Sequence, residues 1–86
     1  MITKELTFDE LATLMKTSAG VTVDPVELEQ ASDAPFSNLG VDSLGLLGIV
    51  GELENRYSVS LPNDAERCKT PAEFVDLVNN TLKTGV

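Results

Sequence analysis

The sequence predicts an all-α protein, a small four-helix bundle with three main helices, a short third helix and a long loop between helices 1 and 2. Three observations support this fold class. Helix-start signals stand at Thr7, Asp42 and Thr70, where a side-chain oxygen can accept a hydrogen bond from the first helical turn. Apolar residues follow each start at helical spacing. The 86 residues contain no repeats and no sustained strand-type alternation, and we expect one domain, 1–86, with a simple core.

The first and last main helices begin with the same capping-box pattern. In "TFDE", Thr7 can cap the helix and Glu10 follows three residues later; in "TPAE", Thr70 is followed by Pro71 and Glu73. Such a box pairs the cap side chain with one backbone N–H group and the glutamate with another. Each helix then carries a stripe expected to face the core: Phe8, Leu11, Leu14, Met15 and Ser18 in the first, and Phe74, Leu77, Val78 and Leu82 in the last.

The first helix is expected to stop at Gly20, and a long connection with two prolines leads from there to Asp42. A connection of this length is uncommon in a compact domain and usually has a reason. The segment "DPVELEQ" repeats the helix-start pattern and predicts a short helical turn. Phe36 and Leu39 are expected to anchor the rest of the connection in the core. Further along, "LPNDAERCK" predicts a turn followed by a short helix.

The start at Asp42 opens a helix expected to run to about Tyr57. Steps of roughly 100° per residue place Leu46, Ile49, Val50, Leu53 and Tyr57 on the core face, and Leu44, Gly48, Gly51 and Asn55 on the opposite strip, with Leu47, Glu52 and Glu54 toward its edges. Each mid-helix glycine costs about 0.5–1 kcal/mol relative to alanine. The strip glycines are either tolerated on a surface or they let another protein approach closely. Gly45 lies on a flank, where close helix–loop packing explains it equally well.

Ser43 is expected to be the first residue of this helix, directly after the capping Asp42. The amide groups of a first turn have no partner within the helix, and the helix dipole is positive there. A phosphate ester on the Ser43 hydroxyl would benefit from both effects. Serine is also frequent near helix starts for structural reasons alone, so the position leaves both interpretations open.

The composition limits the classes of function. Fourteen acidic and six basic residues give a formal net charge of −8, which disfavours nucleic-acid binding and favours either partners with basic patches or simple solubility. The sequence has no histidine, which removes the usual general base and most zinc sites. No stretch matches an EF-hand loop, so no metal site is expected. Cys68 is the only cysteine, no apolar run could span a bilayer and no signal peptide is evident, so we expect a cytoplasmic monomer away from membranes.

The stretch "LGVDSL" (39–44), at the start of an acidic helix, resembles the phosphopantetheine attachment motif of acyl carrier proteins. The resemblance covers nearly the whole chain: a capped first helix, a long loop with an aromatic residue, the D-S-L helix start, "ENRYSVSLP", a short third helix and a Thr-Pro helix start. It implies that Ser43 accepts the 4'-phosphopantetheine arm of coenzyme A through a phosphodiester. The thiol of the arm would carry an acyl chain as a thioester, and the protein itself would not be an enzyme. Cys68 is then interpreted as a half-buried packing residue.

The same resemblance implies a partner-recognition surface on this helix. Asp42 would cap the helix and contribute to recognition by a phosphopantetheinyl transferase. Leu44 and Leu47 match positions where the family presents apolar contacts to partner enzymes. Glu52 and Glu54 would pair with basic residues of those partners, which mainly affects the association rate and its salt dependence.

The sequence departs from the carriers of fatty-acid synthesis, which usually have acidic residues soon after the serine and a larger apolar residue further on. The matching positions here are Gly45, Gly48 and Gly51. We expect Gly48 and Gly51 to belong to the recognition surface because they allow close approach. Acidic surface residues are retained instead at Glu52, Glu54, Asp64 and Glu66.

Arg56, Tyr57, Thr70, Pro71 and Asn79 resemble the freestanding carriers of bacterial type II (aromatic) polyketide synthases, which make antibiotics. This implies polyketide cargo, with ketosynthase/chain-length factor, malonyl transferase and ketoreductase/cyclase-type enzymes as partners. A carrier of fatty-acid biosynthesis is the alternative. A different class, a protein-interaction module without a cofactor, also fits a glycine-smoothed helix. A serine-nucleophile enzyme is disfavoured because the chain offers neither histidine nor a nearby lysine as a base.

Overall fold

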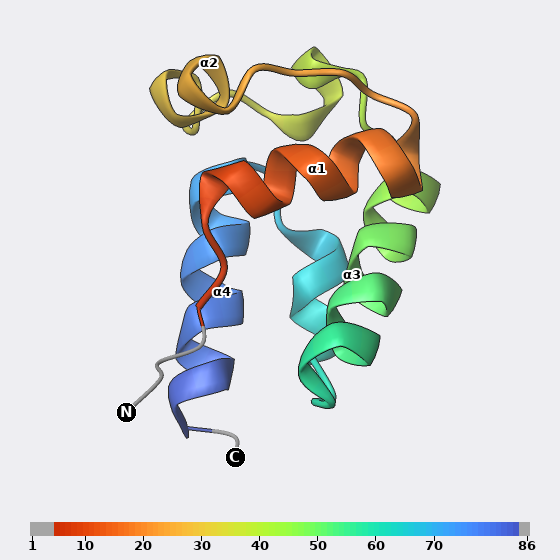
Figure 1. Cartoon of the computed structure of the whole chain (residues 1–86), viewed down its shortest axis with the longest axis vertical. Coiled ribbons are helices and arrows are strands. Elements are labelled where there is room, and N and C mark those ends of the chain that lie inside the picture. Colours follow the sequence, from red (N-terminus) through yellow and green to blue (C-terminus); the bar gives the residue numbers. More distant parts are fainter. Residues whose placement is uncertain (1–4, 85–86) are drawn as a thin grey trace.

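The computed structural model describes residues 5–84, and these form an all-helical fold (Figure 1). Four α-helices and two short 3-10 helices follow one another as α1 (Phe8–Ala19), α2 (Pro25–Gln30), η1 (Phe36–Leu39), α3 (Ser43–Tyr57), η2 (Asn63–Arg67) and α4 (Pro71–Thr84). The described residues contain no strand, so the predicted all-α class is confirmed. None of the helices between residues 5 and 84 is long and apolar enough to cross a lipid bilayer.

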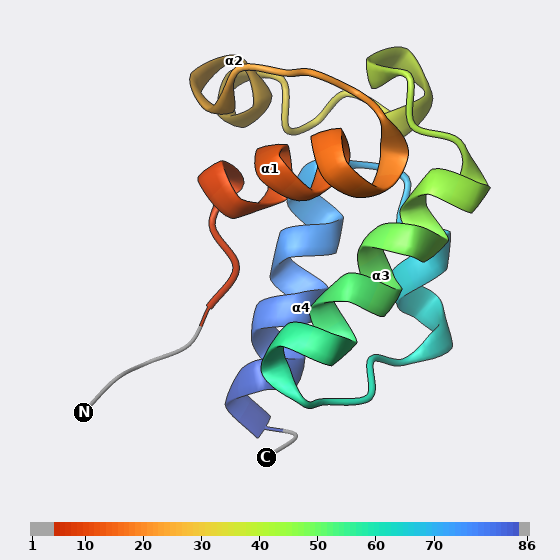
Figure 2. The same ribbon diagram turned by 45° about the vertical axis from the view of Figure 1, so that its right-hand side comes forward.

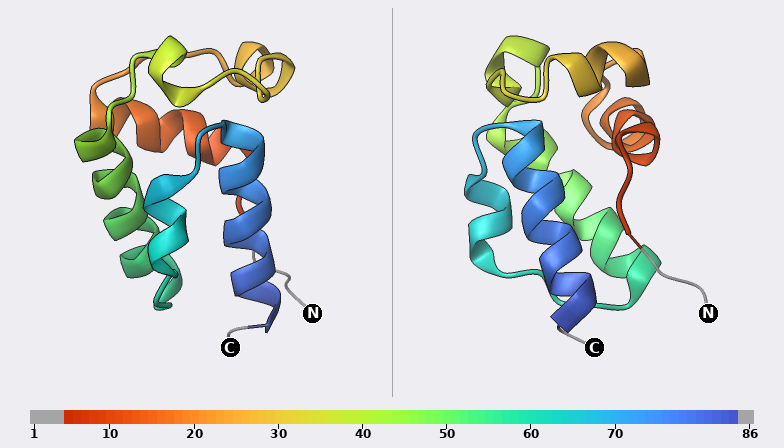
Figure 3. Two further views of the ribbon diagram at one scale, coloured as in Figure 1. Left: turned by 180° about the vertical axis from the view of Figure 1, so that it is seen from behind. Right: turned by 90° about the vertical axis from the view of Figure 1, so that its left-hand side faces the viewer.

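Helix α1 lies across one end of the group formed by α3, η2 and α4 (Figures 1 and 2). Helices α3 and α4 extend away from α1, and η2 packs beside α3. The connection that carries α2 and η1 passes along the other side of α1, as the views from behind and from the side show (Figure 3). The core therefore lies between α1, α3 and α4.

Side-chain oxygens cap all three helix starts that the sequence predicts. The accepted bonds are Thr7 Oγ1 from the Glu10 N–H at 3.1 Å, Asp42 Oδ1 from the Gly45 N–H at 2.7 Å and Thr70 Oγ1 from the Glu73 N–H at 3.2 Å. Helix α1 ends before Gly20, whose φ of 70° lies in the left-handed region. Glycine adopts this conformation without steric cost. The predicted start and stop signals are thus confirmed.

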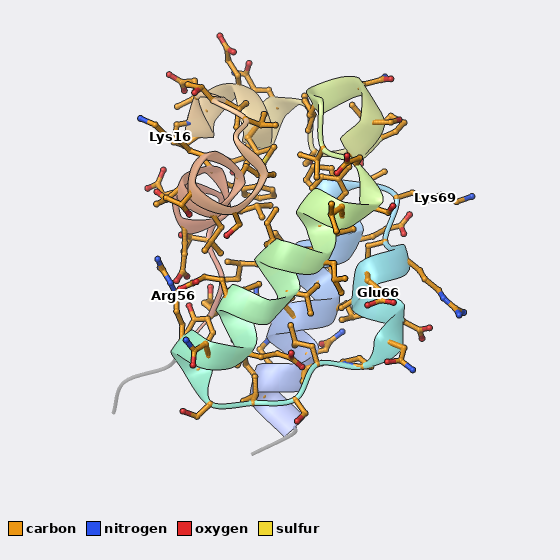
Figure 4. All side chains as sticks on the ribbon, turned by 90° about the vertical axis from the view of Figure 1, so that its right-hand side faces the viewer. Lys16, Arg56, Glu66 and Lys69 are labelled. Carbon is orange, nitrogen blue, oxygen red and sulfur yellow. The ribbon has the colours of Figure 1, made fainter. Side chains whose placement is uncertain are left out.

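The capping box predicted at the first helix is only half formed. The Glu10 carboxylate reaches α3, where it accepts hydrogen bonds from the Tyr57 hydroxyl and, at 3.3 Å, from Arg56 Nη1. Arg56 also donates from Nε to Glu52 at 3.3 Å, and it lies where the end of α3 approaches α1 (Figure 4). Glu10 therefore joins two helices, a contact that a local capping pattern cannot predict.

The short elements refine the prediction made from the sequence. The turn expected in "DPVELEQ" is α2, and the Asp24 carboxylate caps it by accepting from the Val26 N–H at 2.8 Å. The expected short third helix forms as the 3-10 helix η2. The segment from Phe36 to Leu39 is predicted as loop but forms η1, with Phe36 buried and Leu39 half-buried as expected for core anchors.

The long connection is fixed to the start of α4. The Phe36 N–H donates to the Lys69 carbonyl oxygen at 2.8 Å, and the Ala72 N–H donates to the Ser32 carbonyl oxygen at 3.0 Å. The rings of Phe36 and Phe74 meet edge to face with centroids 5.9 Å apart, an arrangement favoured by aromatic quadrupoles. These contacts fix the path of the chain into α3.

The core face of α3 is the predicted one. Leu46, Ile49, Val50 and Leu53 are buried and Tyr57 is half-buried. They pack with the buried side chains of α1 and α4, which include Leu11, Leu14, Met15, Phe74 and Val78. One apolar cluster thus holds the three main helices together.

Candidate functional site

Ser43 is the first residue of α3 and is exposed to solvent. Gly40, with a φ of 87°, turns the chain from η1 toward this start, and Asp42 caps it. The Gly45 and Leu46 amides donate to Asp42. Within the described part of the chain, no acceptor pairs with the N–H groups of Ser43 or Leu44. Two amides and the positive end of the helix dipole therefore remain available beside the hydroxyl.

Gly45 fixes the start of α3 against the end of α1. A Cβ atom at this position would lie 2.9 Å from the Ala19 Cβ and 3.2 Å from the capping Asp42 Oδ1. The first of these separations is shorter than real Cβ contacts, so only glycine fits without movement. Close packing explains this residue, and the packing partner is a helix end.

Gly48 and Gly51 differ in their surroundings, although the sequence assigns them to one exposed strip. A Cβ atom at Gly48 would lie 3.4 Å from the Ser18 carbonyl oxygen, whereas one at Gly51 would meet nothing within 4 Å. Both glycines are exposed, as the sequence predicts. They differ in that Gly48 borders the last turn of α1, whereas Gly51 has open space around it.

Leu44 and Leu47 are exposed, as predicted, with 75% and 48% of their surface accessible to solvent. Together with Ser43 and Glu66 they line a hollow of about 210 Å³ between α3 and η2. The sequence gives no sign that Glu66 lies close to Ser43, because the two residues belong to different helices. The fold thus adds a carboxylate to the surroundings of the hydroxyl.

A second groove, of about 320 Å³, begins on the other side of Ser43. It is lined by residues of η1, the start of α3 and the end of η2: Pro35, Phe36, Ser37, Val41, Asp42, Ser43, Leu46, Glu66, Cys68 and Lys69. A larger depression, of about 390 Å³, lies around the N-terminal end of α1 and includes none of the predicted site residues. Of these two depressions, only the groove beside Ser43 borders the predicted site.

Glu52 and Glu54 are both engaged within the chain. Glu52 Oε2 accepts from Arg56 Nε at 3.3 Å, and Glu54 Oε2 accepts from the Leu61 N–H at 2.8 Å. Neither contact is predicted from the sequence. Glu54 stabilises the loop after α3, so a partner that pairs with this carboxylate must compete with a backbone amide.

Three residues that carry the resemblance to polyketide carriers have structural roles. The Tyr57 hydroxyl donates to Glu10. Burial, followed by the neighbouring Glu10 carboxylate, raises the pKa of Tyr57 to about 12. Asn79 accepts from the Leu6 N–H at 2.6 Å and donates to the Leu6 carbonyl oxygen at 3.1 Å. With Arg56, these side chains hold the ends of the helices in place.

Cys68 is half-buried just after η2, and its thiol donates weakly to the Asp64 carbonyl oxygen at 3.5 Å. Burial raises the pKa of the Cys68 thiol, and the carboxylates of Glu73 and Asp64 act in the same direction. A raised pKa disfavours the reactive thiolate. These surroundings agree with the interpretation of Cys68 as a packing residue.

The surroundings of Ser43 fit a phosphodiester. The hydroxyl is accessible, and two amides without acceptors lie at the start of its helix. The adjacent Asp42 carboxylate is turned to the Gly45 amide, which reduces its repulsion of a second negative group. The fold therefore defines a class of protein: a small helical domain with an accessible serine hydroxyl at the start of its central helix.

The chain matches the model of the protein family described as "Phosphopantetheine attachment site" over residues 9–78. It is 62% identical over 82 residues to a probable acyl carrier protein of Streptomyces coelicolor, which covers 95% of this chain and 91% of the relative. It is 56% identical over 81 residues to the curamycin polyketide synthase acyl carrier protein of Streptomyces cyaneus, covering 94% of this chain and 92% of the relative.

Solved structures of acyl carrier proteins have a fold similar to that of this chain. The 3,5-dioxohexyl acyl carrier protein of the actinorhodin polyketide synthase of Streptomyces coelicolor superposes with a TM-score of 0.79 and 37% identity, covering 99% of this chain and 100% of that one. The oxytetracycline acyl carrier protein gives a TM-score of 0.78 and 34% identity, covering 96% of this chain and 88% of that one.

This chain belongs to the family of acyl carrier proteins. It is a carrier of acyl intermediates and not an enzyme. Its prosthetic group is a covalently attached 4'-phosphopantetheine, and it interacts with the enzymes of a synthase.

Proposed function

We propose that the Ser43 hydroxyl carries the 4'-phosphopantetheine arm and that the acyl cargo is a set of polyketide intermediates. The observation that supports the site most directly is the exposure of Ser43 at the first position of α3, next to two amides without acceptors in the described chain. A phosphate at this position is favoured by the helix dipole.

The attachment is a group transfer from coenzyme A. A bond forms between Ser43 Oγ and the phosphorus of the pantetheine phosphate, and the pyrophosphate bond of coenzyme A breaks, so that its nucleotide half leaves. The hydroxyl proton goes to a base of the transferase. Once attached, the arm supplies a terminal thiol that holds the acyl group as a thioester.

The polyketide assignment is supported by relatives whose names include curamycin, actinorhodin and oxytetracycline polyketide synthases, with 56%, 42% and 38% identity. In a dissociated synthase, the partners are a ketosynthase/chain-length factor, a malonyl transferase and ketoreductase/cyclase-type enzymes. A role in fatty-acid synthesis is the alternative. Genes for a ketosynthase and a chain-length factor beside this gene support the polyketide role, and a fatty-acid synthesis cluster contradicts it.

The proposed recognition surface combines Leu44, Leu47 and the open Gly51 with the polar residues at its margins. Leu44 and Leu47 have no core to face, which supports contact with a partner. The remaining members are Asp42, Gly48, Glu52 and Glu54. We further propose that residues 1–86 act as one acyl carrier domain in the cytoplasm, where a lone thiol such as Cys68 stays reduced.

Intact-protein mass spectrometry tests the attachment. The apo protein is incubated with coenzyme A and a promiscuous phosphopantetheinyl transferase. Wild type is expected to gain one phosphopantetheinyl mass, and Ser43→Ala is expected to gain none. Ser37→Ala is the matched control, since Ser37 is an exposed serine in the same groove. If folded wild-type protein gained no mass, the result would support the cofactor-free interaction module instead.

A further inference from the structure

Four carboxylates lie on α3 or next to it. Three of them already have partners inside the chain. Asp42 accepts from the first turn of α3. Glu52 pairs with Arg56, and Glu54 accepts from the loop that follows α3. A cationic partner gains less from these groups, because each must first leave an existing contact.

Glu66 is the fourth carboxylate, and it differs from the other three. Its side chain is exposed, and it makes no ion pair or side-chain hydrogen bond among residues 5–84. Lys69 follows three residues later but points away from α3 (Figure 4). Glu66 lies on η2, beside α3 (Figure 4), and lines one hollow together with Ser43, Leu44 and Leu47. Its charge is therefore available to a partner that covers this face.

The hollow shared by Ser43, Leu44, Leu47 and Glu66 has two apolar walls and one uncompensated carboxylate. An arginine side chain matches both features. Its methylene stem can pack on the leucines while its planar guanidinium pairs with the carboxylate through two hydrogen bonds. The net charge of −8 adds long-range attraction for a basic surface.

We propose that the phosphopantetheinyl transferase acting on Ser43 inserts an arginine side chain into this hollow and pairs it with Glu66. The inference rests on the proposed attachment at Ser43. Because Ser43 itself lines the hollow, an enzyme that reaches the hydroxyl must cover the hollow as well. In this chain, η2 supplies the charged contact that the uncharged first half of α3, from Ser43 to Gly51, lacks.

Initial rates of phosphopantetheinylation, followed by intact mass at low and at high sodium chloride concentration, test this pairing. Glu66→Gln is expected to lower kcat/KM about threefold to fivefold at low salt and to flatten the salt dependence, because an exposed pair acts mainly on association. Glu66→Asp retains the charge with a shorter side chain, and its kcat/KM is expected to lie between those of wild type and Glu66→Gln. Glu29→Gln is the matched control, since it removes the same charge from an exposed position on α2.

Equal rates for Glu66→Gln and Glu29→Gln at both salt concentrations would overturn the pairing. Failure of wild type to be modified at all would instead overturn the attachment at Ser43, so the two failures are distinguishable. Thermal unfolding of each variant confirms that it is folded. Because both glutamates are exposed, we expect the thermal unfolding midpoint of each variant to stay close to that of wild type.

Discussion

Two glycines of α3 meet opposite surroundings, although both interrupt a helix. Gly45 lies so close to Ala19 that a Cβ atom would stand 2.9 Å from the Ala19 Cβ, whereas Gly51 has no neighbour within 4 Å of that position. Glycine in a helix interior loses conformational entropy on folding and packs no side chain. The contact with α1 explains this cost at Gly45, and no contact among residues 5–84 explains it at Gly51.

We therefore expect alanine to have opposite effects at the two positions. Gly51→Ala is expected to raise the free energy of unfolding by about 0.5–1 kcal/mol. Gly45→Ala is expected to lower it, because overpacking costs about 1–3 kcal/mol and this exceeds the gain in helix propensity. Urea denaturation followed by circular dichroism measures both. Stabilisation by Gly45→Ala would contradict the close contact between α1 and α3.

Single-residue features were predictable from the sequence where they depend on near neighbours. Asp42 and Ser43 could be placed at the start of α3 because capping involves residues only three apart. The difference in surroundings between Gly48 and Gly51 could not be predicted, since it depends on where α1 ends in space. The closeness of Glu66 to Ser43 could not be predicted either, because it also depends on how the helices pack.

At the scale of the helices, Glu10 and Tyr57 form the contact that joins the start of α1 to the end of α3. Burial, followed by the Glu10 carboxylate, raises the pKa of Tyr57 from 10.0 to about 12. A tyrosinate at this position would lose its hydrogen bond and repel the carboxylate. The neutral hydroxyl is thus the form that supports the fold.

The pH dependence of stability is expected to follow from this shift. Because the folded pKa lies above the unfolded value, the contribution of Tyr57 is complete below about pH 10 and is lost as the pH rises toward about 12. Tyr57→Phe is expected to cost about 0.5–1.5 kcal/mol at neutral pH and to lose less stability between pH 10 and pH 12. Urea denaturation across this range compares the two proteins. Parallel losses in both would contradict the assigned role of the hydroxyl.

Asn79 joins α4 to the segment before α1 by bonding both backbone groups of Leu6. Asn79→Ala leaves a partly buried N–H and C=O without partners, and we expect a loss of about 1–3 kcal/mol in the free energy of unfolding. Hydrogen exchange at the Leu6 amide is expected to accelerate. Asp76→Ala, at an exposed position of α4, is the control. An unchanged exchange rate at Leu6 in Asn79→Ala would count against this contact.

The helices themselves were largely predictable, because capping residues and apolar spacing are local signals. The interpretation of Glu10 as half of a capping box failed because Arg56 and Tyr57, on another helix, compete for its carboxylate. The 3-10 helix η1 was also missed. Its position depends on hydrogen bonds to the segment before α4, and no short-range pattern reports such bonds.

The whole molecule carries a formal net charge of −8, and the described residues contain only two ion-pair contacts, both made by Arg56. Self-repulsion of this kind destabilises a compact state and is screened by salt. We expect the thermal unfolding midpoint to rise by a few degrees, on the order of 1 kcal/mol of stability, as sodium chloride increases. Potassium chloride is the control and is expected to act equally. A falling midpoint would indicate that the Arg56 pairs outweigh the repulsion.

The whole fold also explains why the long connection between α1 and α3 is ordered. Its contacts with the start of α4 place η1 beside Ser43, so that residues of three separate segments line the groove next to the hydroxyl. The sequence indicated the serine and the family but not this groove, because its walls come together only through tertiary contacts.

The arm is proposed to be carried by one hydroxyl, at the first residue of α3. Peptide mapping by tandem mass spectrometry of the protein treated with coenzyme A and transferase identifies the modified residue. We expect a single phosphopantetheinyl group, located on Ser43 in the peptide that contains "GVDSL". A group located on any other residue, or its absence from this peptide in folded and fully treated protein, would contradict it.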